Sequence, residues 1–218
     1  TVLDVRTSFG SGSKPYTPKD DNGYSDRRVT LKEAMAQSIN VPAVKVLHLI
    51  GPQAAIRYAR MMGIHSPLDP VPSLALGSSP VTPLEMASVY STFAAGGNHP
   101  EPSAWTRMTD VQDTVLEDVP PAIETHVLQK ETVAQLDDML RAVVTEGTAD
   151  KVGGMPPDAR GKTGTTQDYR DAWFIGEVGA GGMVIGIWLG NDDGHATKGV
   201  TGSALPARLF REIAMEVR

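Results

Sequence analysis

The sequence has no cysteine among its 218 residues, which excludes disulfides, thiolate nucleophiles and cysteine-based zinc sites. Long apolar runs are also missing: Met183–Leu189, the longest, is far shorter than the ~20 residues that a membrane-spanning helix needs. Positive charge is scarce, because 20 Lys and Arg stand against 26 Asp and Glu, a net charge of -6. We therefore expect no nucleic-acid partner, and no membrane contact by this chain itself.

The histidines are few and lack the spacing of metal ligands, so the sequence predicts neither a metal site nor a cofactor. They are His48, His65, His99, His126 and His195. The length of 218 residues and the composition, 40% hydrophobic, suit one large folded domain or two small ones. The chain opens at Thr1 without a signal peptide, and we expect it to be a piece of a longer protein.

The first half of the sequence predicts helices. Thr30-Leu31-Lys32-Glu33 and Thr82-Pro83-Leu84-Glu85 have the form of capping boxes, which open helices. The first helix should break or restart close to Asn40, because the Val41-Pro42 that follows disfavours helical geometry ahead of the proline. Residues 44–62 predict a helix interrupted at Gly51-Pro52.

The second half predicts an antiparallel sheet. The expected strands are Lys162–Thr166, Ala172–Val178 and Met183–Leu189, and the expected helices are Thr132–Val144 and Ala204–Val217. Short strand-like patches also lie around Val111 and Val115. The last strand is apolar on both faces, so helices should cover both sides of the sheet. The predicted fold class is α/β (α+β), an antiparallel sheet flanked by helices.

Gly161-Lys162-Thr163 resembles the end of a phosphate-binding loop, G-x-x-x-x-G-K-[ST]. Pro156 stands where the first glycine belongs, and Gly154 is out of register by two. The sequence that follows favours a strand, whereas that loop must open a helix. A nucleotide-binding function is therefore only a remote alternative.

Lys162-Thr163-Gly164 has a second interpretation, as K-T-G on a strand edge. Lys162 would supply positive potential, the hydroxyls of Thr163 and Thr165 would bind a carboxylate, and Gly164 would let a ligand backbone approach. The alternative is a solvated edge strand with an exposed lysine.

Ser38-Ile39-Asn40 lies at the predicted break between two helices, where Ser38 and Asn40 could point toward one cleft. The alternative is a local capping pair at a helix end, a role that both residue types favour.

Serine acyl-transfer enzymes of the penicillin-binding class carry S-x-x-K, S-x-N and K-T-G in this order. On the last two motifs, the sequence closely resembles the transpeptidase domain of class A (bifunctional) penicillin-binding proteins. The resemblance extends over nearly the whole chain. Its other segments are Val29–Ala34, Val41–Val44, Ala75–Gly77, Val81–Ala87, Gly147–Ala149, Thr165–Thr166, Asp171–Gly176 and Trp188–Asp193.

One departure concerns the nucleophile, which the family carries as the serine of S-x-x-K. The one S-x-x-K here begins at Ser11, but Pro15, Pro18 and Asn22-Gly23 follow and forbid the long helix that should hold it. We therefore expect Ser11 to lie in a loop and the nucleophile to lie upstream of Thr1. Residues 1–218 would then be the C-terminal part of one transpeptidase domain, inactive alone.

The resemblance implies the fold of penicillin-binding transpeptidases and serine β-lactamases. It implies a peptidoglycan D,D-transpeptidase that acts on D-Ala-D-Ala stem peptides through an acyl-serine and is acylated by β-lactams. Ser38 and Lys162 would be catalytic, while Asn40, Thr163, Gly164 and Thr165 would bind substrate. The implied location is the periplasm or the outer face of the bacterial cytoplasmic membrane, with the anchor in another segment. A non-catalytic wall-binding or scaffold domain of the same fold remains the alternative.

Overall fold

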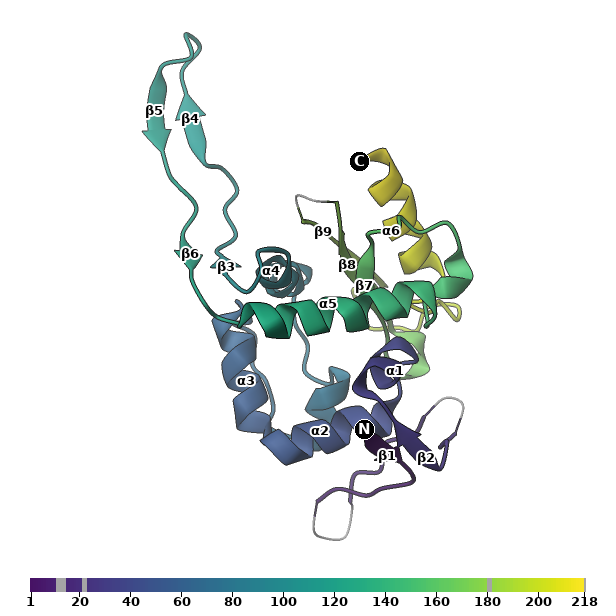
Figure 1. Ribbon diagram of the computed structural model, residues 1–218. Helices are drawn as coiled ribbons and strands as arrows, with labels where there is room; N and C mark the ends of the chain where they lie inside the picture. Colours follow the sequence, from purple (N-terminus) through teal and green to yellow (C-terminus); the bar gives the residue numbers. More distant parts are fainter. Residues whose placement is uncertain (11–14, 21–22, 180–181, 218) are drawn as a thin grey trace.

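The computed structural model describes residues 1–10, 15–20, 23–179 and 182–217. Its centre is a three-stranded antiparallel sheet with helices on both faces (Figure 1). The strands run in the order β7 (Arg160–Thr165), β8 (Asp171–Val178) and β9 (Met183–Gly190). Each predicted strand is therefore present, and the pairing of β8 with β9 is antiparallel as expected.

The two faces of β8 pack against different helices. On one face Phe174 is fully buried against Phe210 of α6 (Leu205–Glu216), with ring centroids 4.6 Å apart. On the other face Ile175 packs into a cluster with residues of α4 (Pro83–Ala94) and α5 (Lys130–Thr145). The prediction that helices cover both faces is confirmed, and the apolar character of the sheet strands follows from it.

The N-terminal half packs beside this core. A short ribbon of β1 (Val2–Asp4) and β2 (Arg27–Val29) leads into the helices that follow. These are α1 (Leu31–Ala36), α2 (Asn40–Ile50), α3 (Pro52–Met61) and the 3-10 helix η1 (Pro72–Leu76). Helix α2 begins at Asn40, which confirms the restart predicted close to that residue, and it includes four residues ahead of the helical range 44–62. Pro42 falls in its first turn, where a missing backbone N–H breaks no hydrogen bond.

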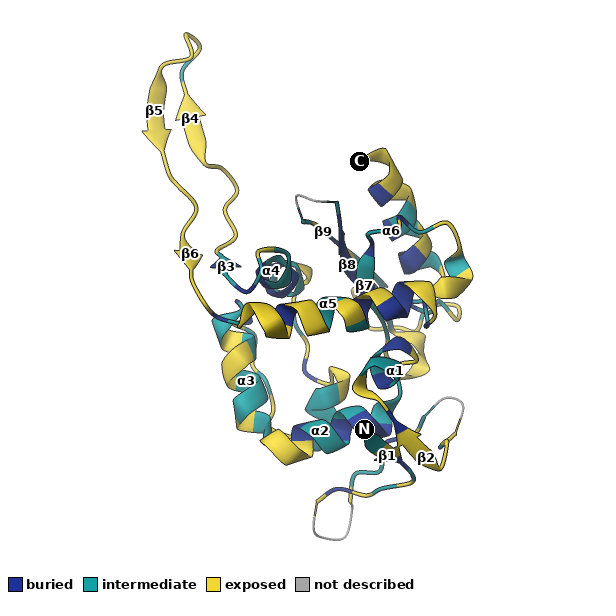
Figure 2. Cartoon of the chain, in the orientation of Figure 1, coloured by how far each residue is buried: buried dark blue, intermediate teal, exposed yellow. Residues whose placement is uncertain are grey.

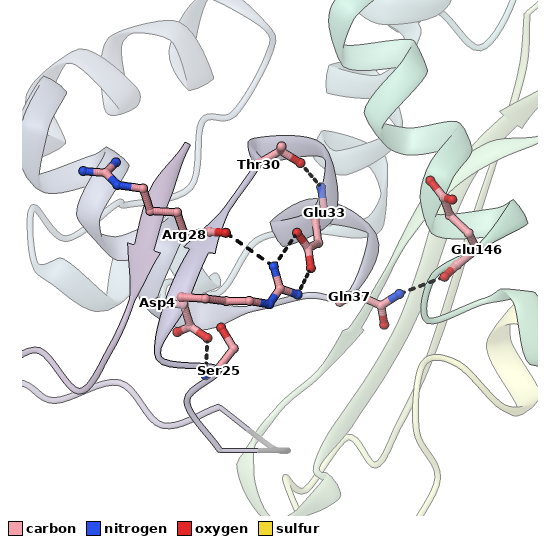
Figure 3. Close-up of polar contacts among 8 residues, drawn as sticks. Asp4, Ser25, Arg28, Thr30, Glu33, Gln37 and Glu146 are labelled. Atoms are coloured by element: carbon pink, nitrogen blue, oxygen red, sulfur yellow. Dashed lines mark hydrogen bonds and ion pairs between the residues drawn. The ribbon is translucent and has the colours of Figure 1, made fainter.

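The two predicted capping boxes have different outcomes. At Thr82 both halves of the box are present. At Thr30 the hydroxyl accepts a hydrogen bond from Glu33 N, 3.0 Å away, but the Glu33 carboxylate pairs with Arg27 (Figure 3). The box predicted there is therefore only half formed, because a guanidinium from the preceding strand takes the carboxylate.

A long arm projects from the body between α4 and α5 (Figure 1). It is built from two short ribbons, one of β3 (His99–Pro100) with β6 (Ile123–Glu124), and one of β4 (Arg107–Thr109) with β5 (Val115–Asp118). Its outer ribbon is exposed on both faces (Figure 2). Val115 begins β5 as predicted, whereas Val111 lies in the turn at the tip and the strand expected around it is wrong. Within the described residues, no helix combines the length and apolar character that spanning a membrane requires.

Candidate active site

Ser38 occupies the turn that ends α1. The N–H of Ile39 donates to Ala34 O at 2.9 Å and the N–H of Ser38 donates to Met35 O at 3.2 Å, the bond pattern of a Schellman cap. Such a cap needs a left-handed residue, usually glycine, and Ser38 has a φ of 56°. A serine in this conformation costs roughly 1–2 kcal/mol. The turn leaves its hydroxyl exposed beside the sheet rather than bonded to the helix.

Lys162 and Ser38 meet, although 124 positions separate them in sequence. Lys162 extends from β7, and its Nζ donates to Ser38 Oγ at 2.8 Å and to the carbonyl of Thr163 at 3.1 Å. The K-T-G residues thus form a strand at one edge of the sheet. This geometry excludes the phosphate-binding loop, since Gly161, Lys162 and Thr163 lie inside a strand and open no helix.

The ammonium of Lys162 is in an environment that disfavours its charge. Burial of the amine lowers the pKa of Lys162 from 10.5 to about 8. At neutral pH the amine still carries its proton and can give it up at modest cost. A lysine tuned to this range is suited to proton transfer.

The two hydroxyls that follow Lys162 each contact another part of the chain. Thr163 Oγ1 lies 2.8 Å from Thr148 Oγ1, and Thr165 Oγ1 accepts a hydrogen bond from Gly202 N at 3.0 Å. A Cβ added to Gly202 would lie 2.4 Å from Gly164 O, so a backbone does approach Gly164 closely, and it belongs to this chain. Because Gly202 N occupies a lone pair of Thr165 Oγ1, the proton of that hydroxyl is available to an acceptor.

Asn40, the other residue of S-x-N, is the first residue of α2. Its Nδ2 donates to the carbonyl of Lys19 at 2.6 Å, and its backbone N–H donates to the Asp20 carboxylate. These bonds hold the Asn40 side chain against residues 19–20. The orientation directs Nδ2 to the protein and leaves Oδ1 as the atom that could accept a ligand N–H.

Sequence reasoning did not identify several residues that position this strand. Thr148 and Gly202 contact it from distant segments, and Arg160 of β7 pairs with Asp137 of α5 at 3.3 Å. Arg160 also binds the fully buried carboxylate of Glu177, whose pKa burial raises. No local pattern signals these contacts, although Gly147-Thr148-Ala149 lies within a segment that carries the family resemblance.

Ser11, the start of the one S-x-x-K in the sequence, lies outside the described residues. Within the described residues, no three His, Asp or Glu side chains gather as metal ligands would. The site therefore consists of a lysine, hydroxyls and an amide arranged between the end of α1 and the edge strand β7.

Serine, lysine and threonine side chains thus lie together at the edge of an antiparallel sheet that helices cover on both faces. The family model described as the penicillin binding protein transpeptidase domain matches residues 6–215. The chain belongs to this family. Penicillin-binding protein 1A of Aquifex aeolicus is 37% identical over 195 residues, which cover 85% of this chain and 26% of that protein. Penicillin-binding protein 1B of Escherichia coli is 34% identical over 183 residues, 82% of this chain and 21% of that protein.

Solved structures show the same fold. Penicillin-binding protein 1A from Haemophilus influenzae matches with a TM-score of 0.87 at 23% identity, covering 99% of this chain and 38% of that one. The imipenem acyl-enzyme of penicillin-binding protein A from M. tuberculosis matches with a TM-score of 0.76 at 23% identity, and the match covers 99% of this chain and 54% of that one. The expected transpeptidase fold is thus confirmed, while the chain spans about a quarter of the length of the curated relatives it matches.

Proposed function

We propose that this chain is the part of a peptidoglycan D,D-transpeptidase domain that carries its S-x-N and K-T-G motifs. The observation that supports the proposal most strongly is the 2.8 Å hydrogen bond from Lys162 Nζ to Ser38 Oγ. It joins the two motifs across the sequence and brings a partly buried amine that can donate a proton next to a hydroxyl that can relay it. Family membership supplies the reaction class, acyl transfer from a peptide through an acyl-serine.

The proton path follows from the direction of this hydrogen bond. Because Lys162 donates to Ser38 Oγ, the Ser38 proton is free to point toward the leaving group. When the D-Ala-D-Ala bond breaks, Ser38 gives that proton to the departing amine and takes another from Lys162. Because the pKa of Lys162 is lowered to about 8, the transfer of its proton to Ser38 costs less free energy than it would from an ordinary lysine.

Substrate binding uses the edge of β7. Thr163 and Thr165 donate hydroxyl hydrogen bonds to the terminal carboxylate, and the Lys162 ammonium adds attraction for the anion. Asn40 Oδ1 accepts the N–H of the substrate peptide. An extended stem peptide can also pair with the open edge of the strand at Gly164, as peptides do on other exposed sheet edges.

The nucleophile belongs to a separate segment in this proposal. The serine and lysine of S-x-x-K precede residue 1 on a helix that completes the domain, so residues 1–218 alone are inactive. β-Lactams acylate that serine. The domain works outside the cytoplasm, in the periplasm or on the outer face of the membrane, and is anchored through a further segment.

The test measures D-alanine release from a synthetic D-Ala-D-Ala stem peptide by the full-length protein. Ser38→Ala and Lys162→Ala should each lower the rate by about 10²–10⁴-fold, the usual contribution of a positioned proton-transfer group. Ser103→Ala, on the exposed arm, is the matched control and should leave the rate unchanged. If the wild-type protein folds but releases no D-alanine and takes up no β-lactam, the enzyme proposal fails and the non-catalytic wall-binding domain replaces it.

A further inference from the structure

Thr148 lies at a junction between α5, α1 and β7. Its backbone N–H donates to Ala36 O at 3.0 Å, at the C-terminal end of α1 and two residues before Ser38. Its hydroxyl lies 2.8 Å from the hydroxyl of Thr163 on β7. One residue therefore touches both halves of the proposed site, the turn that carries Ser38 and the strand that carries Lys162.

The junction is held tightly on the α1 side. The side chain of Gln37 donates to Glu146 O at 2.8 Å (Figure 3). Gly147 is buried, and a Cβ on it would lie 2.2 Å from Ala36 O, so the backbones touch with no room for a side chain. These contacts fix the backbone of Thr148, and with it the position from which its hydroxyl reaches Thr163.

The direction of the hydroxyl pair decides what Thr163 can bind. Each threonine hydroxyl has one proton and two lone pairs. If Thr163 donated to Thr148, it would have no proton for a carboxylate. If Thr148 donates to Thr163, the Thr163 proton is free, and a chain runs from Thr148 through Thr163 to the anion in which each bond strengthens the next.

Thr165 gives a precedent for the second arrangement within the same strand. Its hydroxyl accepts from the backbone N–H of Gly202, which can only donate. Both hydroxyls beside Lys162 would then have a lone pair occupied by the protein and a proton directed to the ligand. Two such donors next to an ammonium suit a carboxylate.

We propose that Thr148 is a positioning residue that donates to Thr163 Oγ1 and so orients the Thr163 proton toward the carboxylate of the ligand. Thr148 does not touch the ligand itself. The inference deepens the proposed function and rests on it, since Thr163 is assigned there to carboxylate binding. It predicts that removing the Thr148 hydroxyl weakens the reaction of ligands with a free carboxylate more than that of ligands without one.

The test compares acylation of the full-length protein by a penicillin and by the methyl ester of the same penicillin. The quantity measured is the ratio of the two acylation rates, acid over ester. Thr148→Val keeps the side-chain shape but removes the hydroxyl that orients the Thr163 proton, and the ratio should fall about fivefold, the effect of losing one hydrogen bond between neutral groups. Thr148→Ser keeps the hydroxyl and should hold the ratio within about twofold of wild type. Thr145→Val, an exposed threonine at the end of α5, is the matched control.

A merely structural role would lower both rates together and leave the ratio unchanged, which would overturn the inference alone. If Thr148→Val does not fold, Thr148→Ala removes the hydroxyl with a smaller side chain and must show the same fall. Unfolding of both variants with Thr148→Ser folded would assign Thr148 to stability and also overturn the inference. A wild-type protein that no penicillin acylates would overturn the proposed function as well, so the two failures are distinguishable.

Discussion

Replacing Lys162 by methionine tests the electrostatics of the site through stability. The pKa of Lys162 falls from 10.5 to about 8 because burial disfavours the ammonium. At 1.36 kcal/mol per pKa unit, this fall is equivalent to about 3 kcal/mol of destabilisation wherever the folded amine is charged. Lys162→Met removes that cost and loses about 1 kcal/mol for each of the hydrogen bonds to Ser38 and to the Thr163 carbonyl. The variant should therefore be about 1 kcal/mol more stable than wild type at pH 7.

The stability advantage of Lys162→Met over the wild-type protein should shrink as the pH rises. Below about pH 8 both the folded and the unfolded amine are protonated, so the cost is complete; above 10.5 both are neutral and the cost is gone. Stability of the wild-type protein, relative to Lys162→Met, should thus rise between pH 8 and 10.5. Urea denaturation at pH 7, 8.5 and 10 measures the difference, with Lys151→Met at an exposed position as control. A destabilised Lys162→Met at pH 7, or a difference constant with pH, would refute the reasoning.

Other predictions concern packing and hydrogen bonds elsewhere in the fold. Glu85 is partly buried, which raises its pKa, but hydrogen bonds from Thr82, Ser66 and His65 outweigh this and lower the pKa from 4.5 to about 2. Glu85→Gln should therefore cost about 2 kcal/mol at pH 7, discounted for partial exposure, and the cost should vanish as pH falls from 4.5 toward 2; equal loss at every pH in denaturation curves would contradict this. Gly202→Ala should cost about 2 kcal/mol or more, because its Cβ would lie 2.3 Å from Trp173 O, whereas Gly186→Ala, exposed on β9, should be nearly neutral by calorimetry. Replacing residues 103–121 by a short Gly-Ser loop should change the melting temperature by less than about 2 °C, because Glu101 N already bonds Ala122 O at 2.9 Å at the base of the arm; a larger fall would mean that the arm supports the core.

Local patterns in the sequence predicted the elements whose signals are local. The capping box at Thr82, the three sheet strands and the C-terminal helix all follow from short-range spacing, and each is present. The break between the two helices was also predicted, but its cause is the left-handed turn at Ser38, since Val41 before Pro42 is helical. The half-formed box at Thr30 was not predicted, because it depends on the contact between Glu33 and Arg27 of the preceding strand.

The assembly of the site could be expected only through the order of the motifs. Ser38 and Lys162 lie 124 residues apart, and no hydrophobic pattern in the sequence predicts that their side chains are in contact. The hydrogen bond between Thr148 and Thr163 could not be predicted from the sequence either, since it depends on how the end of α5 packs against α1 and β7. The sequence allowed two roles for Ser38, a helix cap or a residue of the site. Its backbone takes part in the cap of α1, while its hydroxyl is hydrogen-bonded to Lys162.

Mass spectrometry of the full-length protein after incubation with penicillin tests the central claim most directly. The account predicts that the protein gains the mass of one penicillin, that the label maps to a serine of an S-x-x-K outside residues 1–218, and that Lys162→Ala slows labelling. A label on Ser11 would contradict the placement of the nucleophile. A folded protein that gains no label would contradict the assignment of Ser38 and Lys162 to acyl transfer.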